Sequence, residues 1–481
     1  MNRKPIPFMV CMLASTICVT GCTVGPRYQR PATDVPQTFR RATAPEISPN
    51  PATASLGDET WAEVFQDPTL QQLIREALAN NYDVRIAAER VLEQQDQVGI
   101  TRAQQFPTVS GGGNYTAIGL PGSLVNSLNS GSSGSGNRPS DYYSGGAMLS
   151  AAWNLDFWGL YRRQTQAARA QLLATEWGRR MTISTVVENV ATAYFQLRTL
   201  DAELAITKRT VEARKQSLQL TETLEQGGSG TLADVRQAQV LLYTATAEIP
   251  DLERQIQQQE NSIRILLGRN PGPIVRDTAP VTWPAPEQIP AGIPSQLLER
   301  RPDIQQTEAQ LVAANANVGV AKAQLFPQLS LTGLGGIASS QLVGLVDANN
   351  AYWLAFGNLT QTIFDGGKLR NNLKLSKAQK QEQILAYQRT LKQAFQSVSN
   401  ALIGLQKYRE YREQEAKLTA AAEDATRLAK LRYNGGSTSY LEVLTNDMNY
   451  YSAQLNLAVA QEQEALSLVQ LYSALGGGWQ Q

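Results

Sequence analysis

Apolar residues recur at every seventh position along two neighbouring stretches of the chain, which are separated by a run of glycines. The first stretch carries them at Ile183, Val190, Leu197, Leu204, Val211 and Leu218. The second stretch carries them at Val235, Leu242, Ile249, Ile256 and Ile263. A period of 3.5 residues per turn is typical of helices that pack as coiled coils. Because glycine permits a tight reversal, Gly227–Gly230 predicts a turn, and residues 160–267 are predicted to form a helical hairpin.

The first of these helices is predicted to be unusually long. An unbroken helix from Leu160 to Gln226 would extend over roughly 100 Å. The usual helix of a globular protein has about 11–12 residues. An ordinary hairpin in a soluble bundle is the simpler alternative, and the length argues against it. The hairpin is therefore expected to span a distance greater than one compact domain.

The chain also contains an internal duplication. An offset of 220 residues aligns Val98-Gly99 with Val318-Gly319 and Phe106-Pro107 with Phe326-Pro327. Further along, an offset of 208 residues aligns Gly159, Arg162, Gly228 and Val235 with Gly367, Arg370, Gly436 and Val443. The change of offset predicts an insertion in the first copy, and the Gly/Ser/Asn-rich stretch 119–140 is its natural place. We therefore predict two structural repeats, residues 61–268 and 295–476.

Each repeat is predicted to contain a helix, two β-strands and a long helical hairpin. Asp67 is a suitable N-cap and Pro68 a suitable first residue for a helix that would end before Pro107. The β-hairpins are predicted at 108–156 and 328–365, and the helical hairpins at 160–267 and 367–475. Alternation within the strands is modest, so a small soluble hairpin is the safer interpretation of each strand pair taken alone.

Three segments lie outside the repeats. Residues 22–60 are predicted to form an extended arm, residues 269–294 a proline-rich crossover linker, and residues 477–481 a short tail. Pro250 falls within the returning helix of the first repeat, where the second repeat has Ala458. A kink is therefore predicted near Ile249 in the first repeat alone.

The amino-terminal residues have the pattern of an export signal. Arg3 and Lys4 precede a mostly apolar stretch, which ends in Val19-Thr20-Gly21-Cys22. This order is that of a bacterial lipoprotein signal at residues 1–21, in which the sulfur of Cys22 receives a lipid. A plain secretory signal with an incidental cysteine is the alternative. Lipoproteins kept at the inner membrane usually have Asp after the cysteine, so Thr23 implies export to the outer membrane by resemblance to that class.

Composition excludes several classes of protein. The net charge is +1 with no basic run, which argues against nucleic-acid binding. There is no histidine, and the cysteines are Cys11, Cys18 and Cys22. A metal site, a cysteine nucleophile or a histidine base is therefore not expected, and the predicted protein is not an enzyme. No cofactor is expected beyond the covalent lipid on Cys22.

Four strands are too few to close a barrel. An open sheet edge cannot lie in lipid, because each unpaired backbone N–H and C=O group costs several kcal/mol there. Either the strands lie in water or several chains combine them. Three chains would supply twelve strands together with twelve helical rods, so one copy number would close both a strand barrel and a helical barrel.

Several motifs resemble the TolC-like outer-membrane efflux factors, in the lipoprotein branch typified by OprM and NodT. They are the lipobox at Cys22; Trp61, Phe65, Asp67-Pro68 and Leu70; Phe106-Pro107; Pro294-Ser295-Gln296-Leu297-Leu298; Arg301-Pro302-Asp303-Ile304; and Ala474-Leu475-Gly476-Gly477-Gly478-Trp479. The resemblance covers nearly the whole mature chain. It implies a mainly α-helical protomer with a transmembrane β part, and a homotrimer with a 12-stranded β-barrel on a periplasmic α-barrel. It also implies a periplasmic adaptor and an inner-membrane pump, of the RND type or similar, as partners.

The same resemblance implies a set of functional residues at the periplasmic end. The adaptor-docking tips would be the turns at Gly228-Ser229 and Gly436-Ser437, although simple turn formation explains these glycines equally well. The gate would involve Leu441 and residue 445, where the family's Asp is replaced by Thr445. An apolar constriction at Leu441 is therefore expected without an acidic ring. Arg432 and Tyr433 are possible gate tethers, with ordinary surface residues as the alternative.

These features together predict a passive exit duct of a tripartite efflux system. It would conduct drugs or other toxic small molecules across the outer membrane, where the lipid-anchored chain would have a long periplasmic extension. Two alternatives remain open: an exit duct for type I protein secretion, and a structural coiled-coil lipoprotein without a pore.

Overall fold

The computed structural model describes residues 23–36, 38–39, 55–121, 140–277, 294–340 and 347–480. The chain divides into two compact units. Unit 1 comprises residues 1–31, 93–173 and 309–385, and unit 2 comprises residues 32–92, 174–308 and 386–481. Each unit takes residues from both predicted repeats, 61–268 and 295–476. The two repeats are therefore apparent in the sequence, whereas each compact unit combines residues from both repeats.

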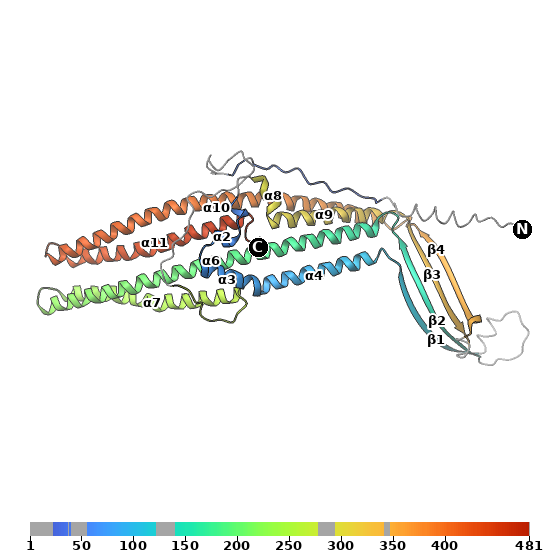
Figure 1. The fold of residues 1–481 in the computed structure, drawn as a ribbon, viewed down its shortest axis with the longest axis horizontal. Helices are drawn as coiled ribbons and strands as arrows, with labels where there is room; N and C mark the ends of the chain where they lie inside the picture. Colours follow the sequence, from blue (N-terminus) through green and yellow to red (C-terminus); the bar gives the residue numbers. More distant parts are fainter. Residues whose placement is uncertain are drawn as a thin grey trace, which may run out of the picture. The chain divides into compact units, whose positions relative to one another are not determined.

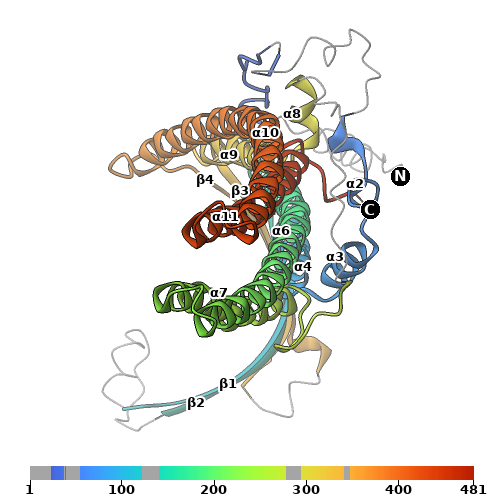
Figure 2. The same ribbon diagram turned by 90° about the vertical axis from the view of Figure 1, so that its left-hand side faces the viewer.

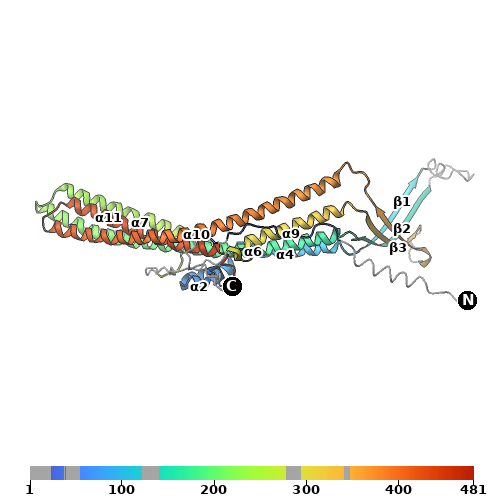
Figure 3. The ribbon, with the colours of Figure 1, turned by 90° about the horizontal axis from the view of Figure 1, so that it is seen from above.

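Unit 1 contains one sheet of four antiparallel strands (Figures 1 and 3). The strands are β1 (Thr108–Leu120), β2 (Ser140–Leu155), β3 (Gln328–Ser339) and β4 (Ala351–Thr360), in that spatial order. The fourth strand ends before the predicted boundary at residue 365. Asp365 instead accepts hydrogen bonds from the backbone N–H groups of Gly367 and Leu369, at the start of the helix that follows.

The strand register places residues of the same parity on the same face of all four strands. In the antiparallel ladder Val109 lies opposite Ala151, Trp153 opposite Leu331, and Gly335 opposite Trp353. The odd-numbered positions 109–117, 145–155, 329–337 and 351–359 hold only Gly, Ala, Val, Leu, Ile, Tyr and Trp. The even-numbered face carries the polar residues, and there the hydroxyls of Ser110 and Ser150 lie 2.7 Å apart. One face of the sheet is thus apolar over these odd-numbered positions, and Ser339 at the end of β3 is a polar residue on the same face.

Unit 2 is built mainly from two helical hairpins. The first is α6 (Leu160–Gln226) with α7 (Leu232–Leu266), and the second is α10 (Lys368–Asn434) with α11 (Tyr440–Ala474). The amino-terminal parts of α6 and α10 belong to unit 1. In each hairpin the return helix runs alongside the long helix (Figure 1), and the two return helices α7 and α11 are neighbours (Figure 2).

The seven-residue apolar pattern marks the packed side of these helices. The buried members of the pattern are Ile183, Val190, Leu197, Val211, Val235, Leu242, Ile256 and Ile263. Leu204, Leu218 and Ile249 are half-buried. The helix α7 continues without interruption through Pro250. A bend at that position stays a prediction.

The predicted first helix, from Pro68 to about Gln105, is in fact two helices, α3 (Pro68–Asn80) and α4 (Tyr82–Ala103). Asp67 caps α3 as expected, accepting from the N–H groups of Thr69 and Leu70. The break falls at Asn81, whose side chain accepts from the N–H groups of Asp83 and Val84 and donates to the Leu266 carbonyl at 2.9 Å. The N-cap at Asn81 and its hydrogen bond to the end of α7 therefore interrupt the helix that the sequence predicts to be continuous.

The second repeat has a comparable break. Here α8 (Leu297–Arg300) is separated from α9 (Pro302–Ala323) by Arg301, which donates to the Ala474 carbonyl at 2.7 Å. The remaining short elements are η3 (Leu56–Asp58), α2 (Trp61–Val64), η4 (Pro294–Gln296) and η6 (Ala348–Asn350).

An aromatic core lies beside these breaks in unit 2. Tyr194 is fully buried and donates its hydroxyl to the capping residue Asp67 at 2.7 Å. Phe65 packs edge-on against both Phe195 and Tyr472, with ring centroids 6.4 and 5.7 Å apart. Residues of the first and second repeats thus share one core.

Candidate functional site

Each helical hairpin of unit 2 ends in a glycine turn at its tip. The carbonyl of Leu224 accepts from the N–H groups of Ser229 and Gly230. In the second hairpin, the carbonyl of Arg432 accepts from the N–H group of Ser437. Gly228 and Gly436 have φ angles of +73° and +70°, which L side chains rarely adopt. A Cβ atom at either glycine would meet nothing within 4 Å. Within one chain, the backbone angle and not crowding requires these two glycines.

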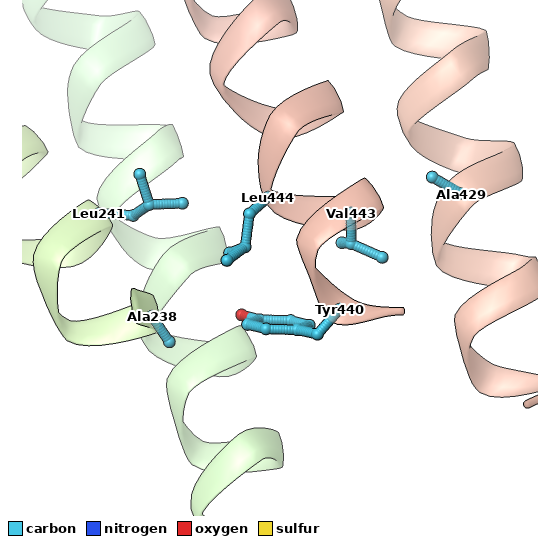
Figure 4. Close-up of a cluster of buried hydrophobic side chains, with 6 residues drawn as sticks. All are labelled: Ala238, Leu241, Ala429, Tyr440, Val443 and Leu444. Carbon is cyan, nitrogen blue, oxygen red and sulfur yellow. The ribbon is translucent and has the colours of Figure 1, made fainter. Parts of the chain in front are cut away.

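Behind the tips, the two hairpins pack against each other through an apolar cluster (Figure 4). Its members are Ala238 and Leu241 of α7, Ala429 of α10, and Tyr440, Val443 and Leu444 of α11. The hydroxyl of Tyr440 lies 3.2 Å from that of Ser217 on α6. Four helices from both repeats therefore converge at this cluster.

A buried ion pair lies beside the cluster. Arg214 of α6 donates to Asp447 of α11 at 2.9 Å and to the Leu241 carbonyl of α7 at 2.9 Å, and its side chain is 5% exposed. Its guanidinium lies over the ring of Tyr451 at 5.1 Å, and the Tyr451 hydroxyl lies 3.0 Å from that of Thr207. The sequence analysis assigned no role to Arg214. A single arginine within an apolar heptad pattern does not indicate which residue it pairs with, because that residue lies in the other repeat.

The predicted gate residue Leu441 lies on the exposed side of α11, with 60% of its surface accessible in the protomer. The hydroxyl of Thr445, one turn later, donates back to the Leu441 carbonyl at 2.9 Å. Both side chains thus lie away from the apolar cluster. No acidic side chain occupies position 445.

The two proposed tethers make contacts within their own hairpin. Arg432 donates to Glu442 at 2.8 Å, and Glu442 also accepts from the Thr438 hydroxyl. Tyr433 packs against Tyr440 with ring centroids 5.3 Å apart. Burial raises the pKa of Tyr433, and the charge of Asp234 on the first hairpin raises it further. In the protomer these residues stabilise the hairpin that carries Leu441.

Three carboxyl groups face one another further along unit 2. Burial is the main cause that raises the pKa of Glu203 to about 7, and the charges of Glu462 and Glu248 raise it further. Burial also raises the pKa of Glu462, while a hydrogen bond from Thr199 opposes this. Helices α6, α7 and α11 thus bring two further acidic groups close to the half-buried Glu203.

The predicted lipid site Cys22 lies outside the described residues, but the arm that follows it is held closely in unit 1. The N–H of Val24 donates to the Trp158 carbonyl at 3.1 Å, and Arg163 donates to the Val24 carbonyl at 3.2 Å. Gly25 has a φ angle of +113°, and a Cβ there would lie 2.5 Å from the Cα of Gly319. Both the backbone angle and the close approach therefore require glycine at this position.

In the described part of the chain, no group of three or more Asp, Glu or Cys side chains is arranged to hold a metal ion. None of the described helices has an apolar stretch long enough to cross a lipid bilayer.

Comparison with known proteins places this geometry in a family. The family described as "Outer membrane efflux protein" matches residues 73–269 and 293–477, which together cover most of the chain. The chain belongs to the outer membrane efflux protein family. The two matched segments correspond closely to the two predicted repeats, and the resemblance seen in the sequence is confirmed.

Relatives of this outer membrane efflux protein match it from end to end. The solvent efflux pump outer membrane protein SrpC of Pseudomonas putida is 34% identical and aligns with 100% of this chain and 99% of its own. The cation efflux system protein CusC of Escherichia coli O6:H1 is 31% identical, with 99% of each chain covered. The predicted outer-membrane location and efflux function are therefore confirmed at the level of the family.

Solved structures agree on the fold. The open-state Neisseria gonorrhoeae MtrE outer membrane channel has a TM-score of 0.83 at 30% identity, over 95% of this chain and 99% of that one. A CusC crystal structure gives a TM-score of 0.83 at 29% identity, over 95% and 100%. The predicted combination of long helices with a small set of strands is thus confirmed.

Proposed function

We propose that this outer membrane efflux protein is the homotrimeric exit duct of a tripartite efflux system. The observation that carries the proposal is the four-stranded sheet. Within the described residues, β1 and β4 each pair on one side only, and one face of the sheet is apolar over most of its length.

The free edges require partners if the sheet lies in lipid. Unpaired backbone groups in the hydrocarbon region cost several kcal/mol each, so only closed barrels and helices span membranes. The apolar odd-numbered face would contact lipid, and the even-numbered face, with Ser110, Ser150 and Asn358, would line water. Three copies would join β4 of one to β1 of the next and close a barrel of twelve strands.

The helical hairpins supply the periplasmic part of the duct. In this proposal the tips at Gly228-Ser229 and Gly436-Ser437 contact a periplasmic adaptor, which connects the duct to an RND-type or similar inner-membrane pump. The names of relatives such as SrpC, an efflux pump outer membrane protein, support a place in such an assembly. The energy comes from the pump, and the duct performs no catalysis.

The gate of the duct is proposed at Leu441. Its side chain is exposed in the protomer beside Thr445, and three copies would bring three leucines around one axis. The constriction would be apolar without an acidic ring. Arg432 and Tyr433 would stabilise it by holding the second hairpin together.

The proposed cargo is a class of toxic small organic molecules, such as drugs. The names of relatives include both solvent and cation efflux at similar identity. The chain has no histidine and six methionines, so it is poor in the side chains that bind soft metal cations. Composition therefore favours organic compounds.

The lipid anchor on Cys22 is likewise part of the proposal. Its support is the signal pattern at residues 1–22 and the hydrogen bonds that hold Val24 and Pro26 in unit 1. These contacts would fix the chain directly after the lipid at one place on the trimer.

Planar-bilayer recording of the purified full-length protein tests the proposal. A pore that opens in discrete steps, together with a trimer mass by native mass spectrometry, is the expected result. A monomer that passes no current would favour the structural lipoprotein without a pore. Co-purification of an intact complex from membranes would distinguish an efflux pump from a protein-secretion system by the class of inner-membrane partner.

A further inference from the structure

Three arginines surround a cavity of about 210 Å³ in unit 1, where α4 ends and α6 begins. The cavity is lined by Arg102, Gln105, Arg162, Thr165, Gln166 and Arg169. The function proposed above uses none of these residues. We propose that the cavity binds a phosphate group, and that its source is the headgroup of an anionic phospholipid of the outer membrane.

The charge in the cavity is only partly neutralised. Arg162 pairs with Asp156 at 3.2 Å, and the backbone N–H of Arg162 also donates to Asp156. The side chains of Arg102 and Arg169 have no ion-pair or hydrogen-bond partner among the described residues. The guanidinium groups of Arg102 and Arg169 are therefore not neutralised by a described carboxylate, which leaves positive charge in the cavity.

The chemistry of the lining suits a tetrahedral oxyanion. Guanidinium groups donate paired hydrogen bonds to phosphate oxygens, and arginine is the residue most suited to such recognition. Gln105 and Thr165 are joined by a hydrogen bond of 2.5 Å, which fixes the end of α4 to α6 between the arginines. The cavity walls are thus held in place without a ligand.

The position of the cavity favours a lipid as the source of the phosphate. Gln105, which lines it, accepts through its backbone carbonyl a hydrogen bond of 3.0 Å from the indole of Trp153 on the apolar sheet face. Gln166, which also lines it, accepts from Arg163 at 2.8 Å, and Arg163 holds the arm at Val24, close after the proposed lipid anchor. The cavity therefore adjoins both the strand face proposed to contact lipid and the anchored arm.

The second repeat keeps the positive charge at the aligned positions. The three arginines align with Lys322, Arg370 and Lys377, and Gln166 aligns with Lys374; all four aligned residues are exposed. By contrast, the uncharged lining residues Gln105 and Thr165 align with Leu325 and Leu373. Basic residues thus recur at the same level of both repeats although their uncharged neighbours differ. This recurrence is typical of a surface that meets a layer of anionic headgroups.

The test is binding of short-chain phosphatidylglycerol to the detergent-purified full-length protein, counted by native mass spectrometry. The test variant combines Arg102→Gln and Arg169→Gln and leaves the capping pair Arg162–Asp156 intact. The matched control combines Arg254→Gln and Arg427→Gln, two exposed arginines of unit 2 with the same change of charge. A second variant, Arg102→Lys with Arg169→Lys, keeps the charge and removes the paired donors.

We expect the test variant to retain one phospholipid fewer per protomer and to bind phosphatidylglycerol about tenfold more weakly, with the lysine variant intermediate. The control variant should bind like the unchanged protein. Diacylglycerol with the same chains, which has no phosphate, should bind equally to all variants. An unchanged oligomer mass and melting temperature would show that the test variant is folded.

A parallel titration with inorganic phosphate separates the two sources. Arginine-dependent binding of phosphatidylglycerol without comparable binding of inorganic phosphate would support the lipid. Equal arginine-dependent binding of inorganic phosphate would keep the phosphate site and overturn the lipid as its source. Equal binding of phosphatidylglycerol by the test and control variants would overturn the site itself.

Discussion

Leu441 and Asp447 lie on the same helix, α11, and have opposite surroundings. Leu441 is exposed in the protomer, whereas Asp447 pairs with the buried Arg214 of α6. In the sequence alone, a charged residue on a heptad-patterned helix is easily taken for a solvated one. The contact across the repeats shows that the role of Asp447 in the protomer is to neutralise a buried cation.

Replacing Leu441 by Ser should raise the single-channel conductance, or the open probability, of the reconstituted protein severalfold. A smaller and more polar ring would hydrate an apolar constriction more easily. The measurement is planar-bilayer recording, with Leu220→Ser as a control at another exposed leucine of unit 2. Unchanged conductance in the Leu441 variant would remove this residue from the gate.

Asp447→Asn should lower the free energy of unfolding by roughly 3 kcal/mol, because Arg214 would remain buried without a counter-charge. The matched control Arg427→Gln breaks an exposed pair with Asp424 and should cost less than about 1 kcal/mol. Denaturant unfolding of the detergent-purified protein provides the comparison. A similar loss of unfolding free energy in both variants would show that the buried pair stabilises the fold no more than an exposed pair does.

The raised pKa of Glu203 makes stability depend on pH. The folded state holds this proton more tightly than the unfolded chain, since its pKa rises from 4.5 to about 7. Stability from this group is therefore present below pH 4.5 and is lost as the pH rises through about 7. Glu203→Gln should raise the melting temperature at pH 8 and leave it nearly unchanged at pH 4.5. An equal shift at both pH values would contradict this assignment.

At the level of secondary structure, the strands and the helices carry different information. The helices have a period that predicts both their length and their packed side, as the burial of Val190, Leu197 and Val235 shows. Each strand alone alternates only modestly between apolar and polar residues, so its pattern is weak. The ladder shows that the four apolar sides coincide, and this is the property that a membrane requires.

The two sheet faces should respond differently to charge. Leu149→Arg places a cation on the apolar face and should reduce assembly in the outer membrane by roughly 2–4 kcal/mol. Ser150→Arg, one residue later on the polar face, should be tolerated much better. The measurement is the amount of heat-resistant oligomer in the outer-membrane fraction. Equal loss in both variants would mean that the odd-numbered face does not contact lipid.

At the scale of the whole molecule, the described chain leaves both edges of its sheet without a neighbour. Association of identical copies would pair β4 with β1 and convert two incomplete repeats into a continuous wall. The same association would place the exposed Leu441 side chains of several copies near one another. Assembly and gating are therefore coupled in this proposal.

Disulfide cross-linking can test the edge pairing directly, because Cys22 is the sole cysteine after residue 18. Cysteines introduced on β1 around Gly111 and on β4 around Gly357 should link neighbouring copies. A chain that carries both cysteines should give a covalent trimer on denaturing gels. The control is the unchanged chain with Cys22, and recovery of monomers at every tested pair would exclude the β4–β1 contact.

The sequence by itself determined the duplication, the helical hairpins, the glycine turns and the approximate strands. Periodicity and turn chemistry are local properties, which can be recognised in the sequence without the folded structure. The cap at Asp67 belongs to the same class, because its partners are two and three residues away.

Tertiary structure alone decided the helix break at Asn81, the pairing of Arg214 with Asp447, the common apolar face of the sheet and the arginine-lined cavity. Each of these depends on groups far apart in the chain; Asn81, for example, binds the carbonyl of Leu266. A local pattern gives the side of a helix or strand that will be buried. It does not give the partner, because the partner is fixed only when the repeats pack together.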